Sequence, residues 1–244
     1  MASVADHYDR HLGEIYAWMQ GGAEAGFTRG REELRVLGVE RVESRLAVDL
    51  GAGYGSHAVP LADLGWAVIA VERCGPLLRE LAHHAAGRTI TVIDSDMSVF
   101  ARHLSRPVDL ILCLGDTLTH LPDLPSVSGL LSAIATSLAP GGRFVTTFRD
   151  YTRTLNGDAR FIAVRSEPAQ ILTCFLEYGE NTLEVHDLIH RLTDGVWRLS
   201  VSSYPKLRLD PTWVARQLEE SGLEVNSGTA ANGMVRIVAQ GNRT

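Results

Sequence analysis

Three glycines at alternate positions, Gly51, Gly53 and Gly55, constrain the fold of this chain more than any other feature. They follow directly on an apolar stretch, and a second apolar stretch farther along the chain ends at Glu72. Half of a nucleotide-binding site consists of an apolar strand, a glycine turn, a helix and a second strand that ends in a carboxylate. The sequence therefore predicts a parallel α/β sheet with a ligand at its first loop.

The spacing of these glycines separates two kinds of nucleotide site. Dinucleotide-binding dehydrogenases need G-x-G-x-x-G, in which the third glycine lets the first helix pack closely on its strand. Ser56 stands at the position of that third glycine, which counts against NAD. Glu72 does not distinguish a dinucleotide site from another adenosine site, because in both kinds of site a carboxylate at this place accepts hydrogen bonds from a ribose diol.

Strand and helix patterns alternate after the glycine turn. Residues 90–94, 108–116 and 144–148 have the apolar character of further strands. Residues 223–225 and the alternating stretch 234–239 indicate an antiparallel pair near the end of the chain. We therefore expect an α/β fold: a Rossmann-like, doubly wound, mostly parallel sheet of seven strands with an antiparallel C-terminal hairpin.

The chain divides into four zones within one expected domain, residues 1–244. Apolar residues at helical spacing predict a helical lid over residues 1–45. Residues 46–150 form the expected nucleotide-binding core. Alternating patterns separated by hairpin turns predict an antiparallel strand insert at residues 160–208, and residues 209–244 carry a final helix and the strand pair.

The lid and the insert are predicted in more detail. Tyr8, Leu12, Ile15 and Met19 recur on one face of a single helix, which Gly21 and Gly22 then stop. The insert has three strand-like stretches, at residues 171–178, 183–190 and 197–204.

Composition narrows the partners. At 244 residues and 45% hydrophobic content the chain can bury a full core. It has no signal-peptide pattern and no run of about 18 apolar residues, so we expect a cytoplasmic protein without a membrane partner. A net charge of −6 gives no basic footprint for nucleic acid. Three scattered cysteines suggest neither a disulfide framework nor a metal site, which leaves small molecules as the expected partners.

The spacing G-x-G-x-G after Val48-Asp49-Leu50 resembles motif I of the class I S-adenosylmethionine-dependent methyltransferases. Residues 112–123 resemble the "C-L-G-N-S-x-x-H-L-P-D" segment of the glycine N-methyltransferase group, with Asp116 in place of the Asn. Residues 148–151 and 199–205 resemble the "H-R-N-Y" and "L-S-Y-Y-P" stretches of that group. The resemblance covers most of residues 46–225 and implies S-adenosyl-L-methionine as the cofactor.

The resemblance also implies roles for particular residues. Those implied at the cofactor are Gly51, Ala52, Gly53, Glu72, Arg73, Asp96, Met97, Leu114 and Thr117, His120 is implied beside the sulfonium as the catalytic candidate, and Asp116, Arg149 and Tyr204 are implied at the substrate. The N-terminal helix adds three aromatic residues as a lid, because aromatic faces stabilise cations: Trp18 at the cofactor, Tyr16 in catalysis and Tyr8 at the substrate. Structural alternatives stand beside these roles, because a helix face packed on the core, a histidine bonded to backbone and a surface ion pair would leave the same residues in the sequence.

The implied reaction is an in-line attack of a lone pair on an activated methyl group, for which alignment and the exclusion of water matter most. We expect a methyltransferase that acts on a small metabolite, at nitrogen in preference to oxygen. The alternative is a catalytically silent cofactor-binding scaffold or regulatory protein, because a fold does not determine a function. Assembly into a homo-oligomer is left open.

Overall fold

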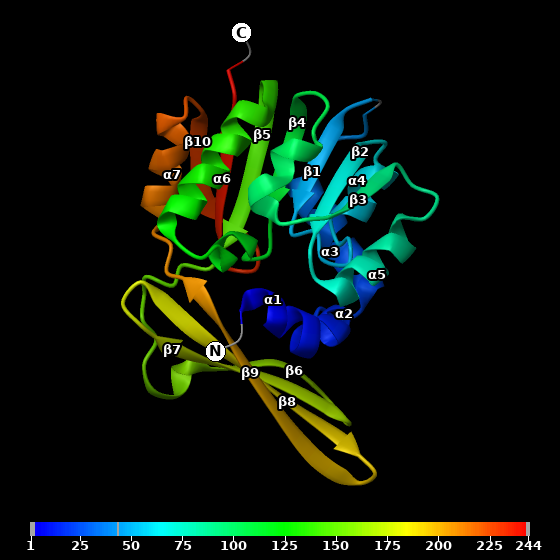
Figure 1. The fold of residues 1–244 in the computed structure, drawn as a ribbon, viewed down its shortest axis with the longest axis vertical. Coiled ribbons are helices and arrows are strands. Elements are labelled where there is room, and N and C mark those ends of the chain that lie inside the picture. Colours follow the sequence, from blue (N-terminus) through cyan, green and yellow to red (C-terminus); the bar gives the residue numbers. More distant parts are fainter. Residues whose placement is uncertain (1–2, 43, 243–244) are drawn as a thin grey trace.

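The computed structural model describes residues 3–42 and 44–242. The parts of the predicted zones at residues 1–2, 43 and 243–244 lie outside the described residues. A seven-stranded sheet forms the centre, in the order β10-β11-β5-β4-β1-β2-β3 (Figure 1). Its strands are β1 (Leu46–Leu50), β2 (Ala67–Glu72), β3 (Ile90–Asp94), β4 (Val108–Cys113), β5 (Leu138–Phe148), β10 (Glu224–Thr229) and β11 (Val235–Gln240).

Strands β1 to β5 are parallel, and β11 runs antiparallel to both of its neighbours, β5 and β10. The central strand β1 is buried at every position, as expected of a parallel strand covered on both faces. Because parallel strands end at the same edge of a sheet, the loops after β1, β2, β3 and β4 meet there. The predicted seven-stranded, mostly parallel sheet with its C-terminal hairpin is confirmed.

Helices cover both faces of this sheet. Two sets of buried side chains define the layers: α6 and α7 pack on one face, and α3, α4 and α5 pack on the other. Asp123 and Asp210 cap the starts of α6 and α7 by accepting backbone hydrogen bonds of 2.8 Å. The helices of the two layers are α3 (Ala23–Val36), α4 (Ala58–Asp63), α5 (Gly75–Ala85), α6 (Leu124–Ser137) and α7 (Pro211–Glu220), and the 3-10 turns beyond the N-terminal segment are η3 (Met97–His103), η4 (Thr117–His120) and η5 (Gly157–Arg160).

The insert forms a second, antiparallel sheet in the order β6-β7-β8-β9. Its strands are β6 (Phe161–Glu167), β7 (Gln170–Tyr178), β8 (Thr182–Thr193) and β9 (Val196–Leu207). The prediction of three strands was wrong by one, because β6 is largely exposed and lacks a clear apolar alternation. Asp194 and Gly195, both with positive φ, close the β8–β9 hairpin as expected.

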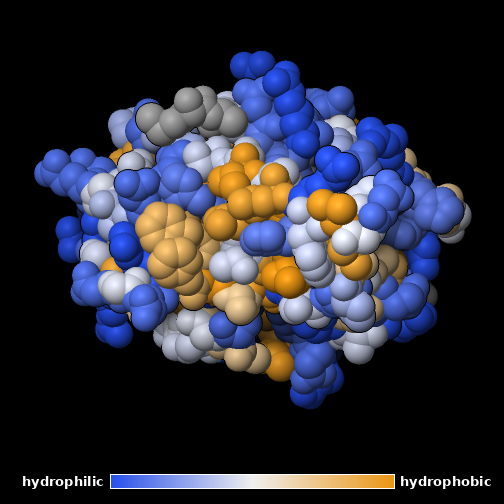
Figure 2. All heavy atoms as spheres, turned by 90° about the horizontal axis from the view of Figure 1, so that it is seen from below, coloured by the Kyte–Doolittle hydropathy of each residue, from blue (hydrophilic) through white to orange (hydrophobic). Residues whose placement is uncertain are grey.

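The far end of the insert exposes apolar side chains. Trp197, Leu199 and Val201 alternate along β9, which is an edge of its sheet, and about half of each side chain is exposed. Figure 2 shows apolar residues gathered on the face seen from below, the side on which the insert lies in Figure 1. Within the described ranges, the helices are too short or too polar to cross a membrane.

The N-terminal segment differs from the single helix that its periodicity predicts. It consists of four short pieces: α1 (Val4–His7), the π-helical turn η1 (Tyr8–Leu12), the 3-10 turn η2 (Gly13–Ile15) and α2 (Tyr16–Met19). A Cβ atom on Gly13 would lie 2.8 Å from Cys74 Sγ, so the segment packs too closely on the start of α5 there for a larger residue. Figure 1 shows this segment between the large sheet and the insert.

Hydrogen bonds tie the segment to both sheets. His7 Nε2 lies 2.9 Å from the Asp187 carboxylate on β8, and Asp9 accepts a 2.8 Å hydrogen bond from the Gly75 backbone at the start of α5. The segment therefore bridges the insert and the core, in the position that the lid prediction requires.

Helix α3 approaches the glycine turn at two glycines one turn apart. A Cβ atom on Gly30 would lie 2.0 Å from the Ser56 backbone oxygen, and one on Gly26 would lie 1.8 Å from Tyr54 Oη. Backbone cannot move aside cheaply, so Gly30→Ala should lower the free energy of unfolding by about 1–3 kcal/mol in chemical denaturation.

Gly129 provides the matched control, because it lies in helix α6 with open space around the position of a Cβ atom. Gly129→Ala should raise the free energy of unfolding by about 0.5–1 kcal/mol, since alanine loses less backbone freedom on folding. Equal stabilities of the two variants would contradict the close approach of α3 to the turn.

Candidate active site

A cavity of about 550 Å³ opens at the edge where the parallel strands end. It is bordered by the loops after β1, β2, β3 and β4, by the N-terminal segment and by the end of β9. A second cavity of about 290 Å³ lies beyond the glycine turn. Both cavities are lined by the same five residues, which are Tyr16, Gly51, Gly53, Gly115 and Thr117. The two spaces therefore meet at the glycine turn, and their combined volume suits an elongated small molecule.

The glycine turn has a backbone that other residues would strain. Gly51 and Gly53 have φ angles of +68° and +59°. A Cβ atom on Gly51 would lie 2.4 Å from Thr117 Cγ2, which itself belongs to the turn η4 after β4. Thr117 is fixed in turn by its hydrogen bond of 2.7 Å to the Leu114 carbonyl. The first and fourth loops thus pack directly on one another and leave a smooth backbone surface for a ligand.

Glu72 lies at the end of β2 and joins this turn to the next loop. Its Oε1 accepts hydrogen bonds of 2.8 Å from the Arg73 and Cys74 backbone N–H groups, and its Oε2 accepts one of 2.9 Å from Gly53. A carboxylate has about four acceptor sites, so these three bonds leave capacity on Oε2. Glu72 lines the main cavity and can accept a hydrogen bond from a hydroxyl group there.

Asp96 and Met97 follow β3 on the neighbouring loop. Asp96 caps the turn η3 by accepting a 2.9 Å hydrogen bond from Ser98, and its other oxygen pairs with Arg73 at 2.7 Å. Met97 lines the same wall of the main cavity. A carboxylate, a guanidinium and a thioether are therefore placed beside Glu72, as a purine site would need.

Three charged residues of the second cavity were missed by sequence reasoning: Asp49, Arg29 and Glu33, of which Glu33 pairs with His57 at 2.7 Å. Asp49, the acidic residue of the strand before the glycine turn, is buried, and its Oδ2 has no hydrogen-bond partner among residues 3–42 and 44–242. Burial raises the pKa of Asp49 to about 6, although His57 and a backbone donor from Ala58 oppose the rise. Arg29 of helix α3 borders the same cavity, so a carboxylate and a guanidinium face one space.

Aromatic side chains enclose the end of the main cavity around His120. Tyr8, from the N-terminal segment, lies with its ring centroid 5.4 Å from that of His120 and 5.9 Å from that of Tyr16. Tyr204 of β9 lies 5.7 Å from His120. His120 Nε2 is buried and has no partner among the described residues, and burial together with the nearby Lys206 charge lowers the pKa of His120 to about 3. His120 is therefore neutral at physiological pH.

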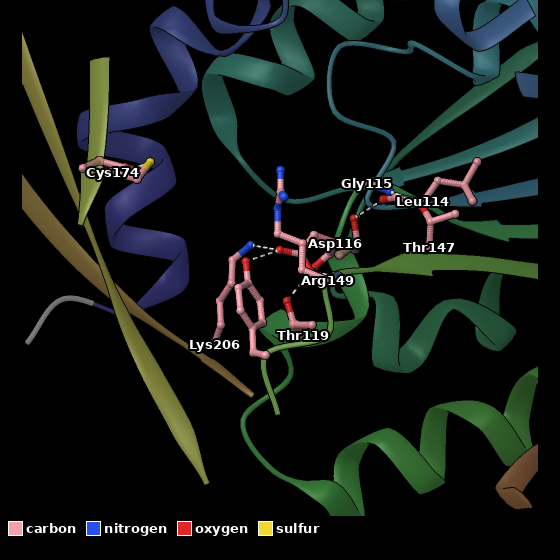
Figure 3. Close-up of polar contacts among 11 residues, drawn as sticks. Leu114, Gly115, Asp116, Thr119, Thr147, Arg149, Cys174 and Lys206 are labelled. Carbon is pink, nitrogen blue, oxygen red and sulfur yellow. Dashed lines mark hydrogen bonds and ion pairs between the residues drawn. The ribbon is translucent and has the colours of Figure 1, made fainter. Parts of the chain in front are cut away.

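Asp116 connects this end of the cavity to the insert. Its buried carboxylate accepts hydrogen bonds from Lys206 Nζ, from Tyr151 Oη at 2.8 Å and from the Arg149 backbone at 2.9 Å (Figure 3). Burial alone would raise the pKa of Asp116, but the Lys206 ammonium and the Arg149 donor hold it below its ordinary value. Asp116 has a φ of 75°, a left-handed conformation that Asp and Asn tolerate better than most residues.

The structure brings most of the implied residues together. Those lining the main cavity are Tyr8, Tyr16, Gly51, Gly53, Glu72, Arg73, Asp96, Met97, Thr117 and His120. Ala52, Leu114 and the exposed Arg149 line the second cavity. Asp116 and Tyr204 line neither cavity and lie behind Lys206 and His120.

Trp18 is not brought to either cavity. Its indole packs under the Arg165 guanidinium of β6, 5.3 Å from the ring centroid. Trp18 thus lies on the side of the N-terminal segment that faces the insert, and this position does not favour its predicted contact with the cofactor.

Lys206 was missed by sequence reasoning, although one signal was available. It is the single lysine among 23 basic residues, and it lies in the main cavity with 7% of its surface exposed.

The low pKa of His120 makes stability depend on pH. In the unfolded chain the pKa of His120 is near 6.5, whereas in the folded protein it is about 3. Between these two values the unfolded state binds a proton that the folded state does not bind, so the folded state loses stability as the pH falls. Between pH 7 and pH 5, the wild type should lose about 2 kcal/mol of unfolding free energy relative to His120→Gln. Denaturation of both proteins at the two pH values measures this, and a constant difference would show that the folded protein protonates His120 freely.

Comparison with known proteins supports the geometry. Residues 47–142 match a family model described as a methyltransferase domain. The glycine/sarcosine N-methyltransferase of Halorhodospira halochloris is 24% identical over 127 residues, which are 51% of this chain and 46% of that protein. The match thus spans about half the length of this curated relative.

Solved structures share the whole fold at low identity. The amino pentose methyltransferase CalS10 from Micromonospora echinaspora, with S-adenosylmethionine bound, has a TM-score of 0.76 at 18% identity, over 95% of this chain and 96% of that one. The sugar N-methyltransferase KedS8 from a Streptoalloteichus species has a TM-score of 0.75 at 19% identity, over 99% and 97%. The chain thus shares the fold of these methyltransferases, and its residues 47–142 match a methyltransferase domain that includes the glycine turn.

Proposed function

We propose that this protein transfers the methyl group of S-adenosylmethionine to a nitrogen atom of a small molecule. The observation that carries the proposal is the pair of adjoining cavities, which share five lining residues, with adenosine-binding chemistry at Glu72 and an aromatic end around His120. The coarser part, a methyltransferase that uses S-adenosylmethionine, agrees with the methyltransferase domain that residues 47–142 match. The nitrogen acceptor rests on the chemistry of His120.

The residues present fit the cofactor. Glu72 can accept from a ribose hydroxyl, and Asp96 with Met97 can hold an adenine amino group and ring face. The methionine part carries an ammonium and a carboxylate, which match the unpartnered oxygen of Asp49 and the guanidinium of Arg29 in the second cavity.

When bound, S-adenosylmethionine supplies a sulfonium methyl group, which moves to nitrogen as the N–C bond forms and the S–C bond breaks with its electron pair left on sulfur. The protein has to align the acceptor and exclude water, which can contribute roughly 7–11 kcal/mol in favourable models. Tyr8 and Tyr16 are placed to do both, because their rings wall the cavity and aromatic faces attract cations.

The low pKa of His120 favours nitrogen over oxygen as the attacking atom. A hydroxyl group is a weak nucleophile that needs a base, and an imidazole with a pKa of about 3 is a poor base. A neutral amine attacks with its own lone pair. In the tautomer with hydrogen on Nδ1, His120 Nε2 can accept an N–H hydrogen bond and aim that lone pair, and the extra proton leaves to water after transfer.

The names of two proteins with a similar structure describe methyl transfer to nitrogen. KedS8 is a sugar N-methyltransferase and MtfA, solved with S-adenosylhomocysteine, is a glycopeptide N-methyltransferase with a TM-score of 0.59 at 23% identity over 86% of both chains. These names support the class of reaction by analogy. Closure of the N-terminal segment as a lid, a cytoplasmic location, a single domain and a homo-oligomer stay predictions.

Glu72 offers a direct test of cofactor binding. Gln in its place would set a side-chain N–H group against the Gly53 N–H and remove an acceptor for the ribose. We expect Glu72→Gln to bind S-adenosylhomocysteine roughly 10- to 100-fold more weakly in calorimetry. Asp94→Asn is the matched control, since this carboxylate ends the neighbouring strand β3 outside both cavities, and its affinity should stay within about twofold. Equal affinity of both variants would remove Glu72 from the site.

Methyl transfer itself is tested with ¹³C-methyl-labelled S-adenosylmethionine and paired small amines and alcohols of the same skeleton. We expect the label on nitrogen, read by mass spectrometry and NMR. Label on oxygen would overturn the nitrogen assignment. Binding of S-adenosylhomocysteine without turnover of any compound would instead favour the scaffold or regulatory protein.

A further inference from the structure

Lys206 presents unused hydrogen-bond donors to the acceptor end of the main cavity. An ammonium group has three N–H bonds, and Asp116 is the single hydrogen-bond partner of the Lys206 ammonium among residues 3–42 and 44–242. The Tyr151 and Tyr204 rings each lie 5.8 Å from Nζ, too far to accept a hydrogen bond. Lys206 therefore keeps donor capacity inside a cavity that it lines.

Lys206 and His120 border the same space. The Tyr204 ring lies 5.7 Å from the His120 ring and 5.8 Å from Lys206 Nζ, so the three side chains are neighbours. Pro205 and Leu207 flank Lys206 in the cavity wall, and Val4 and Ala5 of the N-terminal segment line the cavity as well. A molecule whose nitrogen reaches His120 therefore has its adjoining groups near Lys206.

The charges at this end cancel. Asp116 neutralises Lys206 through their direct contact, and His120 is uncharged. Burial raises the pKa of Tyr8, Tyr151 and Tyr204, so these phenols stay protonated. A carboxylate placed here would lose its hydration without meeting a net positive charge. A hydroxyl or carbonyl oxygen needs only a donor, which Lys206 has.

We propose that Lys206 is a specificity-determining residue, which donates a hydrogen bond to an uncharged oxygen carried next to the acceptor nitrogen. The substrate class is then a neutral amine with an adjacent hydroxyl or carbonyl group, such as an amino alcohol or an amino sugar. This inference rests on the proposed N-methyl transfer.

The test compares three probes of one skeleton in calorimetry with the enzyme saturated by S-adenosylhomocysteine: trans-2-aminocyclohexanol, cyclohexylamine and trans-2-aminocyclohexanecarboxylate. The amino alcohol should bind the wild type about 10- to 100-fold more tightly than either other probe. Lys206→Met would leave Asp116 buried without its cation, so the double variant Asp116→Asn, Lys206→Met is the informative one. It should bind S-adenosylhomocysteine normally and lose the preference. Arg198→Met, an exposed cation farther along β9, should keep the preference.

The single lysine gives a second measurement that needs no variant. Protein labelled with lysine carrying ¹⁵N at Nζ has one side-chain ammonium resonance, which should shift with the amino alcohol and not with cyclohexylamine. Failure of S-adenosylhomocysteine to bind would overturn the proposed function. Three outcomes with normal binding of S-adenosylhomocysteine would overturn the role of Lys206 alone. They are no preference among the probes, no binding of any probe, and a preference that the double variant retains.

Discussion

The buried carboxylate of Asp116 joins the large sheet to the insert. It stands on the loop after β4, and it holds Tyr151 beyond β5 and Lys206 at the end of β9. Removing one partner of a buried ion pair typically costs 3–5 kcal/mol, because the other charge is left without compensation. Separating the insert from the large sheet would therefore break this ion pair, which helps the acceptor end of the cavity to keep its shape.

Charge is distributed unevenly over the site. Asp49 and Arg29 face the second cavity, where a zwitterionic group would find both of its counterparts, and Glu72, Arg73 and Asp96 line the main cavity. At the acceptor end of the main cavity, the Asp116–Lys206 pair, neutral His120 and the protonated phenols carry no net charge. Such a distribution suits a reaction in which a charged donor is held firmly while a neutral nucleophile approaches its reactive carbon.

Sequence reasoning reached the parts of the site that local pattern determines. The glycine turn, Glu72 and Asp96 follow strands whose apolar runs are plain, and parallel strands bring their ends together. It could not reach Lys206, which lies 90 residues from Asp116 and meets it only through the packing of the insert. The position of Trp18 could not be predicted because helical periodicity assumes a continuous helix, whereas the π-helical and 3-10 turns after His7 rotate the side chains that follow.

The most direct test is a crystal structure of the complex with S-adenosylhomocysteine. The account predicts ribose hydroxyls within hydrogen-bond distance of Glu72, the amino group against Asp49 and the sulfur turned toward His120 and Lys206. Ligand density with the sulfur facing away from these two residues, or with the adenosine elsewhere than beside Glu72, would contradict it.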